Sequence, residues 1–281
     1  MKKRAFYLSL GLACFLLPAC QNRDADTYTD ALIQESPTEV SITETQIDET
    51  MEAIDLLVEE ALSNNASLLR AASIDSNLYL TDCPTISIDT VVVPHLMTID
   101  FGTSCTGKDG KVRSGKILVS ATSFKVLPSV RTKTFQDFMV DGRKIEGTVI
   151  KSIQKDVTVH TRTATLKENI TLINTAKGDT VKRISEITRL YKRNVLTDKT
   201  DDQTLTWGTV NNTRSNGAFN TKTILEATPL LFEASCKHIV SGIASFENSK
   251  GKTWSINYGD GSCDDKATMT VNGESKEITI R

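Results

Sequence analysis

Apolar residues recur at three- and four-residue spacing near the start of this chain. This apolar stripe consists of Ile47, Met51, Ile54, Val58 and Leu62. Such spacing places the side chains on one face of an α-helix. Ser41-Ile42-Thr43-Glu44 fits a capping box, and the turns that follow are acidic, as the helix dipole favours. The pattern predicts an amphipathic helix over residues 44–72. Packing on the protein's own sheet is favoured over a coiled coil, because the stripe covers barely two heptads.

From about residue 78 the pattern changes to β-branched runs separated by turn signals. The runs include Ile117-Leu118-Val119, Thr148-Val149-Ile150, Val157-Thr158-Val159 and Ile170-Thr171-Leu172. The turn signals are Asp109-Gly110, Asp141-Gly142, Lys177-Gly178-Asp179, Lys250-Gly251 and Asn272-Gly273. Roughly a dozen strands at this spacing predict one antiparallel β domain over residues 78–281, built as a sandwich, a meander or an open half-barrel. The predicted fold class is therefore mainly β, preceded by one helix.

The first 20 residues have the layout of a secretory signal peptide. Lys2-Lys3-Arg4 precedes an apolar run over residues 5–17. At about 13 residues this run is too short for a transmembrane helix, which needs about 20. Leu17-Pro18-Ala19-Cys20 follows it and resembles a bacterial lipobox, in which the cysteine is acylated and becomes the new N-terminus. We therefore expect residues 1–19 to be removed and Cys20 to carry lipid.

Residues 20–43 are rich in Thr, Asp, Glu and Gln and lack periodic apolar positions, so they are predicted to form a flexible acidic tether. Charge is divided unevenly beyond this segment as well. Residues 20–100 hold 16 acids and two bases, a balance of −14, whereas residues 101–281 hold 28 bases and 19 acids, a balance of +9. The bases alternate with polar residues, which favours solvated strand faces over a nucleic-acid site. The same division predicts an acidic helix lying against a basic sheet.

Four cysteines remain besides Cys20 and Cys14 of the signal peptide: Cys83, Cys105, Cys236 and Cys263. In an exported protein they can pair in three ways. The first two are symmetric about residue 94, inside the predicted turn Val93-Pro94-His95-Leu96. The last two are symmetric about a point between residues 249 and 250, inside Asn248-Ser249-Lys250-Gly251. Each pair would face across its own hairpin, so we favour Cys83–Cys105 and Cys236–Cys263.

The segments that end in Cys105 and Cys263 resemble each other. Ile99-Asp100-Phe101-Gly102-Thr103-Ser104-Cys105 and Ile256-Asn257-Tyr258-Gly259-Asp260-Gly261-Ser262-Cys263 share Ile, Asp or Asn, an aromatic residue, Gly, a polar turn and Cys. These segments and the turn over residues 140–148 resemble uncharacterised Bacteroidota lipoproteins. Gln21-Asn22-Arg23-Asp24-Ala25-Asp26 is similar to the surface-export signal of such lipoproteins, although Ala25 stands where a second acid would follow. The resemblance implies a lipid-anchored protein of the cell envelope at the outer membrane, with surface exposure as a hypothesis, and it implies no activity.

Candidate chemistry is sparse. No two cysteines have the close spacing of a zinc site, and the chain lacks G-x-S-x-G, H-E-x-x-H and P-loop motifs. The three histidines, His95, His160 and His238, are isolated in the sequence. Asp260, Asp264 and Asp265 could offer oxygen ligands to calcium, but the loop lacks EF-hand spacing, and Asp beside Gly is common in turns without metal. We expect no cofactor and no metal.

These observations favour a non-catalytic envelope lipoprotein, a binding or structural module tethered by its lipid to the outer membrane or cell surface. Its expected partners are the membrane and a protein, glycan or lipid ligand that the sequence does not identify. The alternative is a lipid or lipoprotein carrier with a half-barrel and a helix lid, and a hydrolase ranks third. A large apolar concavity under the apolar stripe would favour the carrier, whereas a filled core would favour the module.

Overall fold

The computed structural model describes residues 36–64, 79–156, 161–192, 203–233, 235–236 and 238–280, without the side chains of Asn64 and Asp156. All of these residues fall within one unit, Ser36–Arg281. The predicted signal peptide, Cys20, most of the predicted tether and the end of the predicted helix lie outside the described residues. So do the predicted strand Val157-Thr158-Val159 and His160.

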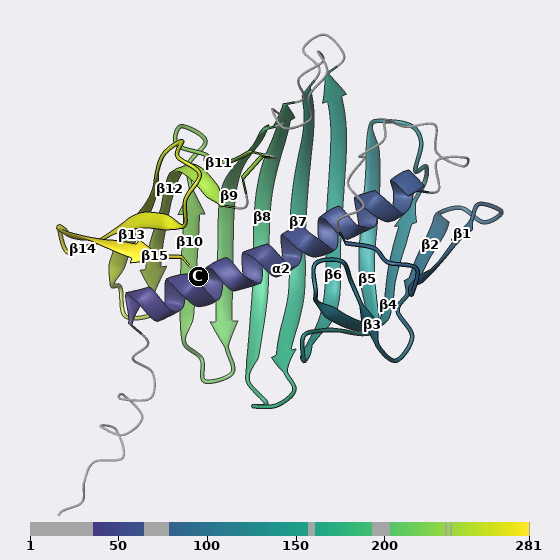
Figure 1. Ribbon diagram of the computed structural model, residues 1–281, viewed down its shortest axis with the longest axis horizontal. Coiled ribbons are helices and arrows are strands. Elements are labelled where there is room, and N and C mark those ends of the chain that lie inside the picture. The colour runs from purple at the N-terminus through teal and green to yellow at the C-terminus, as the bar shows by residue number, and fades with distance from the viewer. Residues whose placement is uncertain are drawn as a thin grey trace, which may run out of the picture. The chain divides into compact units, whose positions relative to one another are not determined.

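A 15-stranded antiparallel sheet forms the body of this unit (Figure 1). The strands are β1 (Thr85–Asp89), β2 (His95–Asp100), β3 (Cys105–Thr106), β4 (Val112–Ala121), β5 (Ser129–Val140), β6 (Arg143–Asp156), β7 (Thr161–Asn174), β8 (Thr180–Lys192), β9 (Gln203–Arg214), β10 (Phe219–Ile224), β11 (Leu230–Glu233), β12 (Ile239–Asn248), β13 (Thr253–Asp260), β14 (Lys266–Val271) and β15 (Glu274–Thr279). Their spatial order is β1-β2-β4-β5-β6-β7-β8-β9-β10-β12-β13-β14-β15, with β3 beside β4 and β11 between β9 and β12. Because the order nearly follows the chain, the sheet is a meander. The prediction of a mainly β fold with one preceding helix is confirmed.

The helix α2 (Pro37–Asn64) crosses one face of the sheet (Figure 1). It begins seven residues before the predicted start at residue 44, so the predicted tether is wrong over residues 37–43. The capping box is Ser36-Pro37-Thr38-Glu39: the Ser36 N–H donates to the Glu39 carboxylate over 2.9 Å, and the Glu39 N–H donates to Ser36 Oγ over 3.2 Å. Proline suits the first helical position, which lacks a partner for its N–H in any case.

The predicted apolar stripe of α2 is buried along its whole length. Two apolar clusters hold the helix to the sheet. The first joins α2, from Ile47 to Leu62, to strands β1–β7, where Ile117 and Phe138 are buried. The second lies at the other end, where Val40 packs with the stacked rings of Phe246 and Trp254, 5.2 Å apart. The helix therefore packs on the protein's own sheet, as the length of the stripe indicated.

The turns predicted from Asp-Gly, Lys-Gly and Asn-Gly pairs lie where the sequence placed them. Asp141 and Gly142 connect β5 to β6 with φ of 47° and 75°, and Asn272 and Gly273 connect β14 to β15 with φ of 52° and 82°. Two consecutive positive φ values are those of the tight hairpin turn that Asp-Gly and Asn-Gly favour. The connection between β1 and β2 differs from its prediction. Thr85 pairs with Asp100, so the turn is centred between residues 92 and 93, and His95 already belongs to β2.

The structure contains both disulfides that hairpin symmetry favours. Cys83 is bonded to Cys105 with 5.8 Å between Cα atoms, and Cys236 is bonded to Cys263 with 5.7 Å. The first bond does not cross the β1–β2 ladder, because Cys105 lies in β3, beyond the loop that follows β2. That extra loop explains why the symmetry argument placed the turn too late.

The similarity between the two cysteine-containing segments extends to their backbone. The Asp100 carboxylate accepts the Gly102 N–H over 2.9 Å, and the Asn257 side-chain oxygen accepts the Gly259 N–H over 3.0 Å. Both segments therefore form the same side-chain-to-backbone turn after a buried strand. They lie in β2 and β13, near the two ends of the sheet.

Candidate functional site

Beside its apolar stripe, α2 meets the sheet through a charged layer. Asp55 and Glu59, four residues apart on the helix, point at β5 and β6. Lys151 Nζ lies 2.7 Å from Asp55 Oδ2 and 2.9 Å from Glu59 Oε1. Lys133 Nζ lies 2.6 Å from Asp55 Oδ1, and Arg131 Nη1 lies 2.9 Å from Glu59 Oε1. All five side chains are buried, so both carboxylates have their counter-ions inside the protein.

The charged layer continues along the helix toward its N-terminus. Asp48 pairs with Arg183 at 2.8 Å and with Lys222 on β10. Arg183 also donates through Nε to Glu168 Oε2 over 2.6 Å. These contacts connect α2 to β7, β8 and β10 in a single network.

Polar contacts extend the charged layer further. Arg189 pairs with Glu52, and the two oxygens of Glu44 accept the side-chain amides of Asn212 and Asn220, the latter over 2.9 Å. Glu44 therefore binds the sheet and is not part of the capping box that the sequence predicted. Four acids of α2 pair with bases of the sheet, as the division of charge predicts: Asp48, Glu52, Asp55 and Glu59.

Ionisation in the charged layer follows from these contacts. Burial raises the pKa of Glu59, but Lys151, Arg131 and Arg162 lower it more, so that it falls to about 2. Burial likewise opposes ionisation of Asp55, and its cationic neighbours again outweigh burial and hold its pKa well below the usual value. The pairs are therefore ionic at neutral pH, and they are buried between α2 and the middle of the sheet.

The face of the sheet away from α2 carries a row of hydroxyl groups on six neighbouring strands. Thr223 belongs to this face because Lys222 and Ile224, on either side of it, are buried toward the helix. Strand register places one member beside the next in the order Thr209, Thr223, Ser245, Ser255, Thr270 and Ser275. We call these six residues the hydroxyl row, and their strands lie roughly 4.8 Å apart.

A hollow of about 440 Å³ lies over the hydroxyl row. Thr221, Glu247 and Asn272 line it beside members of the row. Thr221 Oγ1 donates to Asn211 Oδ1 over 2.8 Å, and Thr270 and Ser275 share a hydrogen bond of 2.8 Å. The lining therefore offers hydroxyl, amide and carboxylate groups together on one sheet face.

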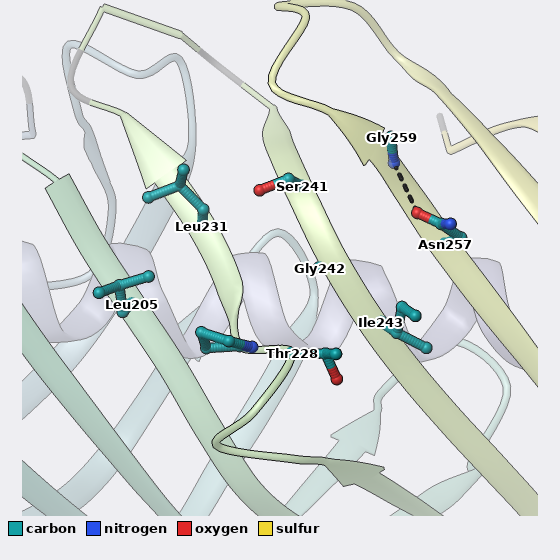
Figure 2. A pocket seen from close by; sticks show the side chains of 9 residues that line it. Leu205, Thr228, Leu231, Ser241, Gly242, Ile243, Asn257 and Gly259 are labelled. Carbon is teal, nitrogen blue, oxygen red and sulfur yellow. Dashed lines mark hydrogen bonds between the residues drawn. The ribbon is translucent and has the colours of Figure 1, made fainter.

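A second hollow of about 440 Å³ lies on the same face, beside β11 (Figure 2). Leu205, Leu231 and Ile243 form its apolar part, and Ser241 and Asn257 form its polar part. Figure 2 shows α2 running behind these strands, so this hollow also opens away from the helix. Both hollows thus lie on the outer face of the C-terminal half of the sheet.

The structure does not bring the candidate calcium ligands together around a shared point. Asp260 Oδ1 accepts the N–H and the hydroxyl of Ser262, and Asp264 Oδ1 accepts the Lys266 N–H. These carboxylates stabilise their own turns. Across the described residues, no group of three His, Cys, Asp or Glu side chains could hold a metal ion. Of the histidines, His95 Nδ1 lies 3.0 Å from the Val92 carbonyl oxygen. The backbone N–H of His238 donates to Cys236 Sγ.

In comparisons with protein-family models, curated proteins and solved structures, the chain matches none. In the part of the chain that the structure describes, no helix is both long and apolar enough to cross a membrane. The sequence did not predict the hydroxyl row. The row depends on the pairing of β10 with β12, and β11 lies between these two strands in the chain. Its only sequence signal is the alternation of Thr and Ser in several strands.

Proposed function

We propose that this chain is a non-catalytic lipoprotein of the cell envelope, held at the outer membrane or cell surface through acylated Cys20, that acts as a binding module. The observation that carries the proposal is that the contact between α2 and the sheet is made by buried side chains of the protein itself. The apolar stripe is buried in the protein core, and the remaining contact is the charged layer. A ligand would therefore be bound on the outer face.

The charged layer also counts against the lipid carrier. A helix lid that swung away from the sheet would uncover Arg131, Lys133, Lys151, Arg183 and Lys222, in the middle of the sheet. Contact between these cations and acyl chains would be unfavourable, because unpaired charges are poorly solvated by hydrocarbon. A carrier would instead require an apolar surface there.

Among the three ligand classes left open by the sequence, the hydroxyl row favours a glycan. A hydroxyl group both donates and accepts hydrogen bonds, which suits the hydroxyl groups of a saccharide. The row extends over six strands, so it would follow an extended polysaccharide chain. Phe219, 48% exposed at the start of β10, offers an aromatic ring on the same face.

Binding to a panel of purified bacterial envelope polysaccharides tests this proposal. Thr223→Val with Ser255→Ala removes two hydroxyl groups of the row and leaves the shape of the strands. Since a net hydrogen bond contributes about 1 kcal/mol, the double variant is expected to bind at least roughly tenfold more weakly. Thr165→Val, the same kind of change on the outer face of β7, is the matched control and should bind like the parent. Equal loss in the control, or no polysaccharide bound by the parent, would count against a glycan-binding module.

A further inference from the structure

The three most exposed aliphatic side chains of the described residues, Val91, Val93 and Val126, lie on two neighbouring connections. Val91, Val92 and Val93, in the turn between β1 and β2, are 92%, 52% and 73% exposed. Val126, in the connection between β4 and β5, is 63% exposed. We call these four residues the apolar tip. Contiguous exposed apolar residues of this kind mark interaction sites in soluble domains.

The two connections leave the sheet at the same edge. His95, the first residue of β2, pairs with Ala121, the last residue of β4. The β1–β2 turn ends immediately before His95, and the β4–β5 connection begins immediately after Ala121. The apolar tip therefore projects from adjacent strands, at the end of the sheet that packs on the C-terminal half of α2 (Figure 1).

Several backbone polar groups at the apolar tip have partners within the protein. The Val91 N–H donates to Asp89 Oδ1 over 2.8 Å, and the Val92 carbonyl oxygen lies 3.0 Å from His95 Nδ1. Ser123 Oγ accepts the N–H groups of Lys125 and Val126 over 3.1 and 3.2 Å. Each amide satisfied in this way lowers the cost of moving the loop out of water.

We propose that the apolar tip inserts into the interface of a lipid bilayer, as a second membrane contact beside the acyl group on Cys20. The inference rests on the proposed function, which places the chain at a membrane. Valine side chains that project from the domain can enter the acyl boundary of a bilayer. Unlike a protein partner, a bilayer needs no matching groove to receive them. Lys125, next to Val126, supplies a cation for anionic headgroups.

The position of the apolar tip gives this second contact a consequence. The described chain begins at Ser36, beside the N-terminal end of α2, whereas the tip lies toward the other end of the helix. At 1.5 Å per residue, the 28 residues of α2 span about 42 Å. A membrane contact at the tip would hold that end of the helix at the bilayer and restrict how the outer face of the sheet is presented.

Vesicle binding by the full mature chain carrying Cys20→Ser tests the apolar tip without the lipid anchor. The probe is vesicles of three parts phosphatidylethanolamine to one part phosphatidylglycerol, and the readout is the fraction of protein that floats with them. We expect the parent to float and the double variant Val91→Asp/Val126→Asp to partition at least tenfold more weakly. The control Ile184→Asp/Leu225→Asp changes two aliphatic residues that are 48% and 60% exposed elsewhere, and it should float like its parent.

Three outcomes would overturn the proposal: no flotation of the parent, equal flotation of the tip variant, or an equal loss in the control. Concentration-dependent dimerisation that is lost in the tip variant, without flotation of the parent, would assign the tip to a second copy of the chain. Thermal unfolding of each variant checks that the fold is retained. Because acylation of Cys20 is measured separately on the native protein, failure of the tip and failure of the proposed lipoprotein are distinguishable.

Discussion

Replacing Lys151 by alanine is expected to lower the free energy of unfolding by about 3–5 kcal/mol, because it leaves two buried carboxylates without their shared counter-ion. Lys151 Nζ bridges Asp55 and Glu59, and its side chain is 2% exposed. In a domain of this size such a loss corresponds to a decrease in Tm of roughly 6–20 °C. Urea unfolding followed by circular dichroism measures it.

Lys167→Ala is the matched control, since it also removes a lysine from an ion pair. Lys167 pairs with Glu186 at 3.3 Å on the outer face, where the two side chains are 60% and 63% exposed. Exposed pairs contribute little to stability, so a change within about 0.5 kcal/mol is expected. If the two variants were equally stable, the charged layer would not hold α2 to the sheet.

Acid is expected to destabilise the protein, because the charged layer loses its ion pairs when its carboxylates are protonated. The pKa values of Asp48, Asp55, Glu59 and Glu168 are lowered by their cationic neighbours, against the effect of burial. A carboxylate with a lowered pKa in the folded state stabilises it above the unfolded pKa, and this stabilisation is lost as pH falls through the folded value. For Glu59, that window runs from 4.5 down to about 2 and corresponds to about 3 kcal/mol.

Glu52 acts in the opposite direction. Burial raises its pKa despite its pair with Arg189, so its protonation favours the folded state and offsets part of the loss. Urea unfolding at a series of pH values between about 7 and 2 measures the balance. Glu59→Gln should be less stable at neutral pH and should lose less stability in acid, whereas Glu186→Gln, on the outer face, should follow the parent. A parent whose stability is independent of pH below about 4.5 would contradict the ionic character of the layer.

Much of the fold could be predicted from local patterns. The spacing of Ile47, Met51 and Ile54 located the buried face of the helix, and pairs such as Asp141-Gly142 located hairpin turns, because each depends on neighbouring residues alone. The helix start was wrong because Ser36-Pro37 was interpreted by composition as tether, although proline is favoured in the first helical turn. The charge division predicted that helix and sheet would pair.

The outer face could not be predicted in the same way. Which hydroxyl lies beside which depends on strand register, and a shift of one residue would move Thr223 to the helix side. The apolar tip was also missed, because Val91 and Val92 fit a buried β run as well as an exposed turn, and only Val93 falls in the predicted turn. Only the pairing of Thr85 with Asp100 places them beyond the ladder.

The most direct test of the proposed lipoprotein is the intact mass of the native protein extracted from cell envelopes, followed by peptide mapping without reduction. We expect a mature chain that begins at Cys20, carries acyl groups there, contains Cys83–Cys105 and Cys236–Cys263, and brings no stoichiometric lipid with it. A mature chain that begins elsewhere and carries no acyl group would contradict the lipid-anchored module, and a tightly bound lipid would favour the carrier instead.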